Sequence, residues 1–247
     1  EQTTDPVLST KLHRPPVDRN CVHRPHLIAR LDQYRDRPLT LVSAPAGYGK
    51  SVLISSWLEA CEDPPAWISL DKSDNDLRTF MTYLVTAVET LFPNVCRKTQ
   101  VLLNTPNLPS IAALSTSMLN ELDRIEQPFI MVLDDYYRIK ETTVHKLITE
   151  ILKHPPKSFH LVIVGRYDPP LPIATLRAQS RVTEIRTQDL CFNVAETQTL
   201  LNQLLGIKVD PSTAATVEEK TEGWVTGVRL AALSMRQVAD IDARLLE

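Results

Sequence analysis

The sequence has few cysteines, no long apolar run and little net charge, and each shortage excludes a class of protein. Its four cysteines are widely spaced and form no CxxC pair, which argues against a disulfide framework and a zinc site: Cys21, Cys61, Cys96 and Cys191. No apolar segment approaches membrane-spanning length, and the polar start Glu1 to Asp5 is unlike a signal peptide. A net charge of −3 gives no general attraction to nucleic acid or to an anionic membrane. We expect a cytoplasmic globular protein, and the missing initial methionine indicates a piece of a longer one.

Glycine is also scarce, with six in 247 residues, yet two of them fall within one octapeptide. The octapeptide Ala44–Ser51 is Ala-Pro-Ala-Gly-Tyr-Gly-Lys-Ser and follows an apolar, strand-like run. This is the pattern of a phosphate-binding loop, with Ala44 in place of the usual first glycine. Gly47 and Gly49 let successive backbone amides turn inward and form an anion-binding nest. The sequence therefore predicts a nucleoside triphosphate site.

The last two residues of this loop are expected to supply a positive charge for the phosphates and a ligand for a metal ion. Lys50 is expected to reach the terminal phosphates and to serve the reaction, and Ser51 is expected to hold Mg²⁺. The apolar spacing after Ser51 predicts a helix whose amino terminus points at the phosphates. The nucleotide-binding residues predicted in this segment are Ala46, Gly47, Tyr48, Gly49, Lys50, Ser51 and Val52.

Apolar runs alternate with amphipathic stretches along most of the chain. Five runs predict strands, near 39–43, 66–70, 129–133, 161–164 and 182–185. Such runs are typical of strands buried on both faces of a parallel sheet, and their alternation with helices indicates right-handed crossovers. From residue 190 onward only helical patterns remain. We predict an α/β fold with a parallel sheet of about five strands and an N-terminal arm in residues 1–187, and a small helical domain in residues 188–247.

Two carboxylates, Asp134 and Asp135, directly follow the third apolar run. Ligands of open α/β sheets lie beyond the carboxyl ends of the strands, so both are candidate site residues. Asp134 is expected to hold Mg²⁺, and Asp135 to orient or deprotonate the attacking water. The alternative is that both carboxylates only cap the turn that follows.

Arg166 follows the fourth apolar run in the same way, one residue after Gly165. The guanidinium group matches the geometry of a phosphate, so we expect Arg166 to contact the γ-phosphate and to report its presence. The alternative is a solvated loop arginine paired with Asp168. Arg177 and Arg181 compete for the same phosphate contact.

Several segments of the chain together resemble one family. They are Thr10–Pro16, Ala44–Ser51, Trp67–Asp71 with Asp74–Asp76, Leu133–Tyr136, and Thr221–Trp224 with Arg229–Leu233. This combination, from about Lys11 to Arg236, resembles the nucleotide-binding core of the MalT-like (maltose-regulon activator, LuxR-type regulator) STAND ATPases, the signal-transduction ATPases with numerous domains. The resemblance implies a P-loop NTPase fold of the ASCE, AAA+-like kind, whose C-terminal helices form a lid.

The resemblance also implies further nucleotide contacts. Val22 and Arg24 fall in the short motif that sandwiches adenine in this family. The segment Gly227–Leu230 matches the part of the lid that touches adenine, and Arg229 replaces the usual proline there. The resemblance assigns the two carboxylates to a Walker B pair and Arg166 to the first sensor.

In this family the core is an ATP/ADP switch with slow hydrolysis. ADP holds a closed monomer, whereas ATP and an inducer permit self-association. Full-length members usually add a helical-repeat sensor and a LuxR-type helix-turn-helix, so we expect contact with DNA only through a domain absent from this chain. Two alternatives to the ATP/ADP switch are a P-loop phosphotransferase (kinase) and a scaffold that binds nucleotide without hydrolysing it.

Overall fold

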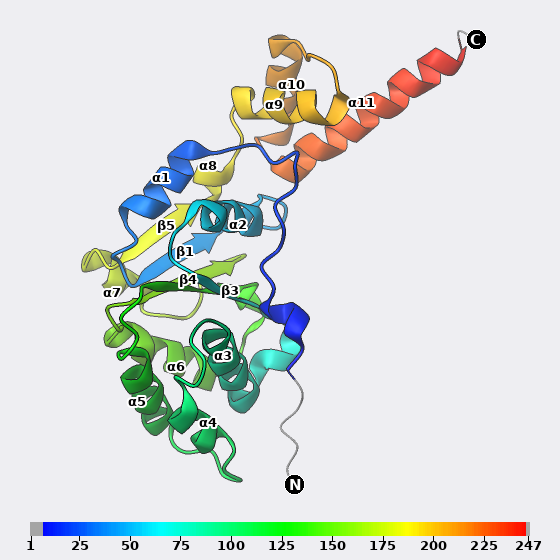
Figure 1. Ribbon diagram of the computed structural model, residues 1–247. Coiled ribbons are helices and arrows are strands. Elements are labelled where there is room, and N and C mark those ends of the chain that lie inside the picture. The colour runs from blue at the N-terminus through cyan, green and yellow to red at the C-terminus, as the bar shows by residue number, and fades with distance from the viewer. Residues whose placement is uncertain (1–6, 246–247) are drawn as a thin grey trace.

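The computed structural model describes residues 7–245, and a five-stranded sheet lies at the centre of this part of the chain (Figure 1). Its strands are β1 (Leu39–Ser43), β2 (Pro65–Ser69), β3 (Phe129–Asp134), β4 (Phe159–Gly165) and β5 (Val182–Arg186). The strand order is β2-β3-β4-β1-β5, and every neighbouring pair is parallel. All five strands therefore end at one edge. Because β4 lies between β1 and β3, the segments that follow these three strands lie side by side.

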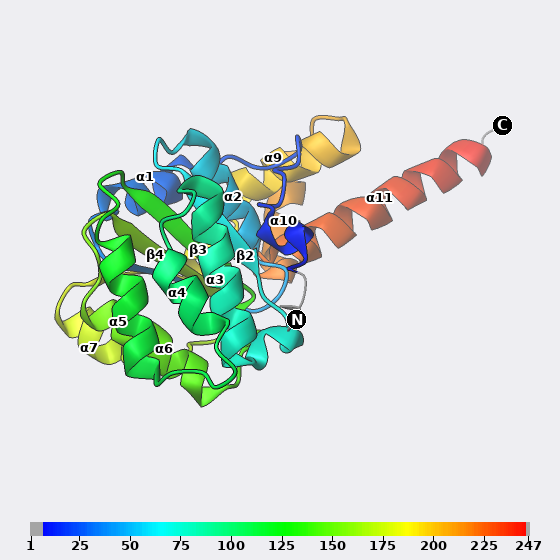
Figure 2. The same ribbon diagram turned by 60° about the horizontal axis from the view of Figure 1, so that its bottom comes forward.

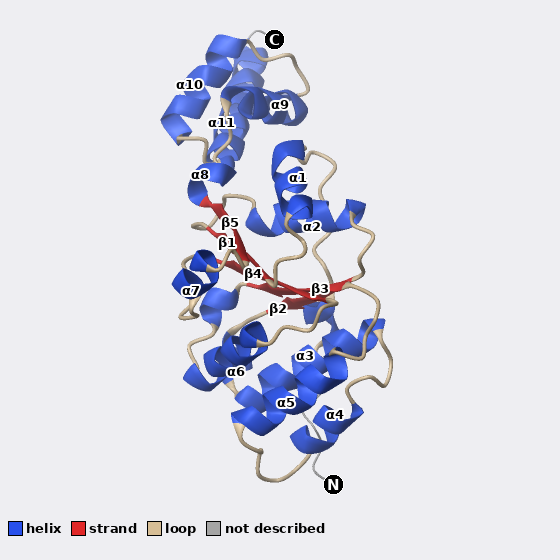
Figure 3. Ribbon diagram, turned by 90° about the vertical axis from the view of Figure 1, so that its left-hand side faces the viewer, coloured by secondary structure: helices blue, strands red, loops and turns tan. Residues whose placement is uncertain are grey.

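Helices cover both faces of the sheet. Figure 3 shows α1 and α2 on one face, with α3, α4, α5 and α6 on the other. The helices are α1 (Pro25–Gln33), α2 (Lys50–Ala60), α3 (Leu77–Leu91), α4 (Arg97–Leu103), α5 (Ile111–Leu122), α6 (Thr142–Lys153), α7 (Ile173–Ala178), α8 (Thr187–Leu190), α9 (Val194–Leu205), α10 (Pro211–Thr221) and α11 (Val225–Leu245). Short 3₁₀ turns are η1 (Ser9–Leu12), η2 (Lys72–Asn75) and η3 (Tyr136–Arg138). Within the described range, no helix is both long and apolar enough to cross a membrane.

The strands are apolar throughout because each face of the sheet packs on a separate layer of helices. In β3, Met131 and Leu133 belong to the core on the α3–α6 side. Their neighbours Ile130 and Val132 belong to the core on the α1–α2 side. Successive side chains of a strand point to opposite faces, so a strand buried on both faces carries apolar residues at every position.

The helices after β5 have an apolar core of their own. It joins α9, α10 and α11, and it includes Phe192 and, from the N-terminal arm, Val22. Figure 2 shows α11 projecting beyond α9 and α10. We call α9–α11 and the turns between them the lid. The domain division at residues 187 and 188 stays a prediction, and the first six and last two residues of the predicted ranges lie outside the described part.

The predicted parallel sheet of about five strands is confirmed, with strand bounds shifted by a few residues at most. Three short helices, α4, α7 and α8, were not predicted. The N-terminal arm is largely extended, as expected, and contains the turn η1. Lys11 anchors this arm: its ammonium contacts both carboxylate oxygens of the fully buried Asp74, at 2.8 and 2.9 Å.

Candidate functional site

The loop between β1 and α2 has the backbone geometry that a phosphate nest requires. Gly47 and Gly49 have φ angles of 84° and 75°, in the left-handed region that favours glycine. Gly49 is also the N-cap of α2, so the first turn of this helix opens directly onto the loop. Ala44 continues the sheet instead, because its amide donates to the Gly165 carbonyl at 3.3 Å. An alanine is therefore accommodated where the usual pattern has glycine.

Lys50 lies at the centre of a group of charged side chains. Its ammonium donates to the Pro45 carbonyl at 2.7 Å. Burial lowers the pKa of Lys50, the carboxylates of Asp134 and Asp135 raise it in part, and the Arg166 guanidinium lowers it further. The first turn of α2 and the ends of β3 and β4 thus bring the predicted charged residues into one neighbourhood.

Ser51 and Asp134 form a direct pair at the start of α2 and the end of β3. Ser51 Oγ donates a hydrogen bond to Asp134 Oδ1 at 3.0 Å. Burial raises the pKa of Asp134 to about 6, although the bonds from Ser51 and from the Asp135 amide favour the ionised form. A hydroxyl and a carboxylate oxygen side by side are hard oxygen donors that suit Mg²⁺. These residues fit the metal predicted for them.

Asp135 differs from its neighbour in conformation and exposure. Its φ angle is 56°, unusual for a residue with a side chain, and its amide donates to Asp134 Oδ1 at 2.9 Å. The Asp135 carboxylate is 46% exposed, lies 3.6 Å from Arg138 Nε and makes no capping hydrogen bond to η3. The alternative that this carboxylate only caps the following turn is therefore wrong. Asp135 instead presents a partly solvated carboxylate beside the Lys50 group.

Arg166 is exposed at the end of β4, with its guanidinium 4.5 Å from the centre of the Tyr137 ring. The alternative pairing with Asp168 is wrong, because Asp168 bonds to Arg186. The other two arginines that were candidates for the γ-phosphate contact bond to other groups of the protein. Arg177 Nε lies 2.6 Å from Glu184, and Arg181, which precedes β5 at the opposite edge, donates to the Leu152 carbonyl at 2.8 Å.

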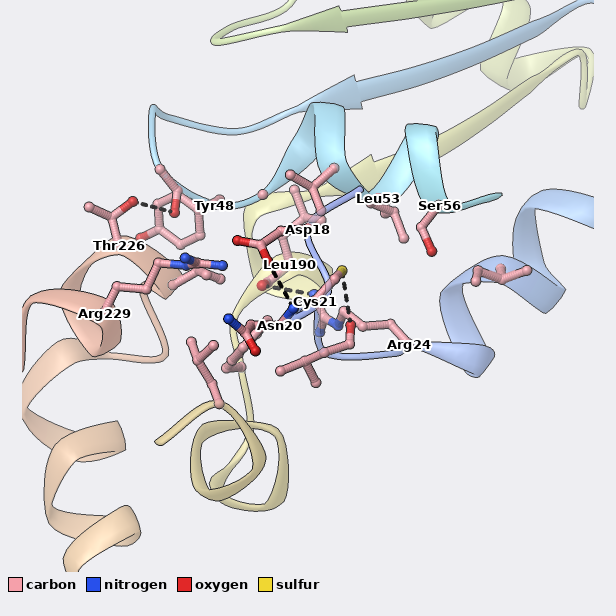
Figure 4. A pocket seen from close by; sticks show the side chains of 18 of the residues that line it. Asp18, Asn20, Cys21, Arg24, Tyr48, Leu53, Ser56, Leu190, Thr226 and Arg229 are labelled. Atoms are coloured by element: carbon pink, nitrogen blue, oxygen red, sulfur yellow. Dashed lines mark hydrogen bonds between the residues drawn. The ribbon is translucent and has the colours of Figure 1, made fainter. Parts of the chain in front are cut away.

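A cavity of about 360 Å³ lies beside the loop, between the arm, α2 and the lid (Figure 4). It has the size and apolar lining of a small-molecule site. Val22, Tyr48, Val52 and Arg229, all predicted from the sequence, line it. Residues that the sequence analysis missed also line it: Asp18, Asn20, Cys21, Ile28, Leu53, Ser56, Leu190, Phe192, Leu200, Val225 and Thr226. The apolar helical spacing of Leu53 marked it only as a core residue, and no local signal distinguishes Leu190 or Phe192.

Arg24 lines the same cavity but has its guanidinium occupied by protein acceptors. Arg24 Nε lies 2.9 Å from Glu196 Oε1, and its two terminal nitrogens donate to the carbonyls of Asp189, Leu190 and Cys191 at 2.9–3.0 Å. The side chain is only 8% exposed. Arg24 therefore ties the arm to the segment that leads into the lid, and its predicted contact with adenine stays a prediction.

Arg229 reaches the cavity from the lid. Figure 4 shows its side chain extending from α11 toward Asn20 of the arm. Burial raises the pKa of the nearby Cys21 thiol, and the positive charge of Arg229 partly opposes this. A cation thus lies at an otherwise largely apolar wall of the cavity.

The lid touches the phosphate loop directly, a contact that was not predicted. Trp224 Nε1 donates to the Ala46 carbonyl at 3.0 Å. The amide and the hydroxyl of Thr226 both donate to the Gly47 carbonyl, each at 3.1 Å. The segment around Trp224 was noted only as part of a family motif.

Comparison with known proteins gave matches to regulators. No family model matched the chain. It is 34% identical over 231 residues to the "HTH-type transcriptional regulator MalT" of Yersinia enterocolitica, and equally to that of Yersinia pestis. Each match covers 94% of this chain and 26% of the relative. The chain thus spans about a quarter of the length of these curated relatives.

Solved structures share the fold. A signal-transduction ATPase with numerous domains (STAND) that has a tetratricopeptide repeat sensor, from Pyrococcus horikoshii, matches with a TM-score of 0.66 at 16% identity. That match covers 86% of this chain and 30% of the other. A point variant of RuvB from Thermotoga maritima matches with a TM-score of 0.51 at 12% identity, over 90% of this chain and 64% of the other. At 16% identity or less, these structures show the fold alone. The 34% identity to MalT over 94% of this chain, together with the phosphate loop, identifies the chain as a nucleotide-binding region of the MalT-like STAND P-loop ATPases.

Proposed function

We propose that this chain binds ATP and ADP with Mg²⁺, hydrolyses ATP slowly and acts as the nucleotide switch of a larger transcriptional regulator. One observation carries the proposal. Lys50, Ser51 and Asp134 converge at the amino terminus of α2, with Ser51 and Asp134 joined at 3.0 Å, next to a cavity large enough for a nucleoside.

Different residues of the site would bind the base and ribose, the phosphates and the metal ion. The base and ribose would occupy the cavity, beside Val22, Val52 and Arg229. The phosphates would lie on the loop amides and the N-terminus of α2, with Lys50 adding a positive charge. Bound Mg²⁺, held by Ser51 and Asp134, would neutralise phosphate charge.

The carboxylate of Asp135 would orient the attacking water and accept its proton. Water then attacks the γ-phosphorus, the bond to the β-phosphate oxygen breaks, and ADP and inorganic phosphate leave. The partly exposed position of Asp135 beside Lys50 supports this role. Arg166, at the end of the neighbouring strand, would contact the γ-phosphate and lose that contact after hydrolysis.

The wider role rests on kinship with regulators that are about four times longer than this chain. We propose self-association in the ATP state and control by an inducer, both in the full-length protein. DNA would be contacted by a part of that protein outside this chain. A cytoplasmic location fits such a regulator.

Nucleotide analysis of the purified chain tests the proposal. Tightly held ADP, with calorimetric binding of both ADP and Mg-ATP and slow release of phosphate, is the expected result. Binding without any phosphate release would support the scaffold instead. An empty site, together with transfer of phosphate to an added acceptor, would support the phosphotransferase. No binding of either nucleotide would overturn the proposal.

A further inference from the structure

The two faces of the phosphate loop are used differently. In a trans peptide unit the N–H and C=O groups point in opposite directions, and no cis peptide occurs in the described residues. The Ala46 carbonyl shares its peptide unit with the Gly47 amide, and the Gly47 carbonyl shares its unit with the Tyr48 amide. Among the residues that the structure describes, neither amide donates to a protein acceptor. Both are free to bind an anion.

The opposite side of these two peptide units is held by the lid. The bond from Trp224 fixes the Ala46 carbonyl, and the two bonds from Thr226 fix the Gly47 carbonyl. Three donors on two carbonyls restrict rotation of both units. A hydrogen bond to a carbonyl also polarises the peptide and strengthens its N–H as a donor.

The approach of lid and loop is close enough to require glycine at position 47, and the turn that carries Trp224 is itself tightly packed. A Cβ atom on Gly47 would lie 2.6 Å from Trp224 Nε1 and would also meet the Thr226 hydroxyl. A Cβ atom on Gly227 would lie 2.9 Å from the Trp224 ring. Gly223, with φ of 67°, accepts a hydrogen bond from the Phe192 amide and turns the chain from α10 into α11. The local geometry thus directs Trp224 and Thr226 onto the loop.

We propose that Trp224 and Thr226 are positioning residues for phosphate binding, which aim the Gly47 and Tyr48 amides at the nucleotide by holding the carbonyls behind them. This inference rests on the proposed function, because it concerns the same nucleotide site. It makes the lid a part of the phosphate site, whereas the family resemblance assigned to the lid only a contact with the base.

One consequence follows from thermodynamic linkage. If docking of the lid improves phosphate binding, phosphate binding must stabilise the docked lid by the same factor. The coupling would run through two peptide units of the loop and would act on the diphosphate of ADP as well as on ATP. It is therefore separate from any response of Arg166 to the γ-phosphate.

The test removes the side-chain donors and keeps an aromatic or branched side chain at each position. Trp224→Phe removes the indole N–H, and Thr226→Val removes the hydroxyl but keeps the backbone amide. Ser234→Ala is the matched control, since it removes a hydroxyl that bonds within the same helix, to the Leu230 carbonyl at 3.1 Å. Binding of ADP and of adenosine is measured by calorimetry for each variant, and thermal unfolding is measured to confirm that each variant is folded.

We expect the double variant Trp224→Phe, Thr226→Val to bind ADP about tenfold more weakly, because each net hydrogen bond is worth a few-fold in affinity. Adenosine, which lacks phosphate, should bind within about twofold of the unmutated chain. Thr226→Ser should restore the contribution of Thr226, and Ser234→Ala should change neither affinity.

Equal losses for ADP and adenosine would overturn the inference, because the contacts would then only hold the lid together. Unchanged ADP affinity in the double variant would overturn it as well. An unmutated chain that binds neither ADP nor ATP would instead overturn the proposed function. Trp224 gives a second readout: Trp57 and Trp67 are almost fully buried, so we expect ADP to change the indole fluorescence and Trp224→Phe to abolish that change.

Discussion

Ser51 Oγ and Asp134 Oδ1 lie 3.0 Å apart, although 83 residues separate them in the chain. The hydrogen bond between them joins the first turn of α2 to the last residue of β3. It places a hydroxyl and a buried carboxylate next to the Lys50 ammonium. This relationship brings together, from two distant segments, the groups that the proposed site for a magnesium nucleotide needs.

Replacement of Lys50 by alanine should weaken binding of both ATP and ADP by about a hundredfold or more. The physical reason is that loss of a desolvated charge contact costs about 2–5 kcal/mol. Lys72→Ala is a suitable control, because Lys72 is an exposed lysine on η2. Calorimetric titration is the measurement. Unchanged affinity in Lys50→Ala would show that the phosphates do not lie where we propose.

Replacement of Asp135 by asparagine should separate chemistry from binding. We expect Mg-ATP affinity to stay within about threefold and phosphate release to fall by roughly a hundredfold, since the amide cannot accept the proton of water. Single-turnover hydrolysis measures the rate, and calorimetry measures the affinity. Loss of both together would instead assign Asp135 to the metal, and unchanged turnover would remove it from the mechanism.

The raised pKa of Asp134 predicts how stability depends on pH. The folded protein holds this proton up to about pH 6, whereas an unfolded chain releases it near the usual 3.8. Between these values the folded state binds more protons, so the contribution of Asp134 to the free energy of unfolding falls as the pH rises. Asp134→Asn removes this contribution. Relative to the unmutated chain, the variant should gain about 2 kcal/mol between pH 4 and pH 7.

Urea unfolding of the nucleotide-free protein at several pH values measures this difference. His145 and His160, whose pKa values burial lowers, are present in both proteins, so their titration cancels in the comparison. Parallel stability curves for the two proteins would show that the Asp134 carboxylate is already ionised at pH 4 in the folded chain.

Replacement of Arg166 by alanine should make the lid insensitive to the γ-phosphate. If ATP and ADP differ by about 1.4 kcal/mol in their preference for one lid arrangement, the populations differ tenfold, and Arg166→Ala should abolish that difference. ADP binding should remain nearly intact. Arg177→Ala is the control, because Arg177 pairs with Glu184.

Distances between a label on the sheet and a label on α11 measure the lid arrangement in this experiment. The unmutated chain should show different distributions with ADP and with a non-hydrolysable ATP analogue. Identical distributions in the unmutated chain would exclude the lid as the part that responds to the γ-phosphate.

Local patterns in the sequence determined the elements and the central part of the candidate site. The apolar run of β3 predicts a strand buried on both faces, and both of its faces do pack on helices. The spacing of Gly47, Gly49 and Lys50 predicts the nest, because glycine adopts a positive φ without the steric cost that a side chain adds. These properties depend on residues that are neighbours in sequence, so the sequence shows them.

Contacts between distant segments were decided only by the tertiary structure. Arg24 meets Glu196 across 172 residues, and Trp224 meets Ala46 across 178. The strand order, which puts β4 between β1 and β3, brings Arg166 near Lys50. A hydrophobic period reports which face of an element is buried but not against which other element it packs. The partners of Arg24 and Trp224 therefore follow from the path of the whole chain, which no local spacing of residues encodes.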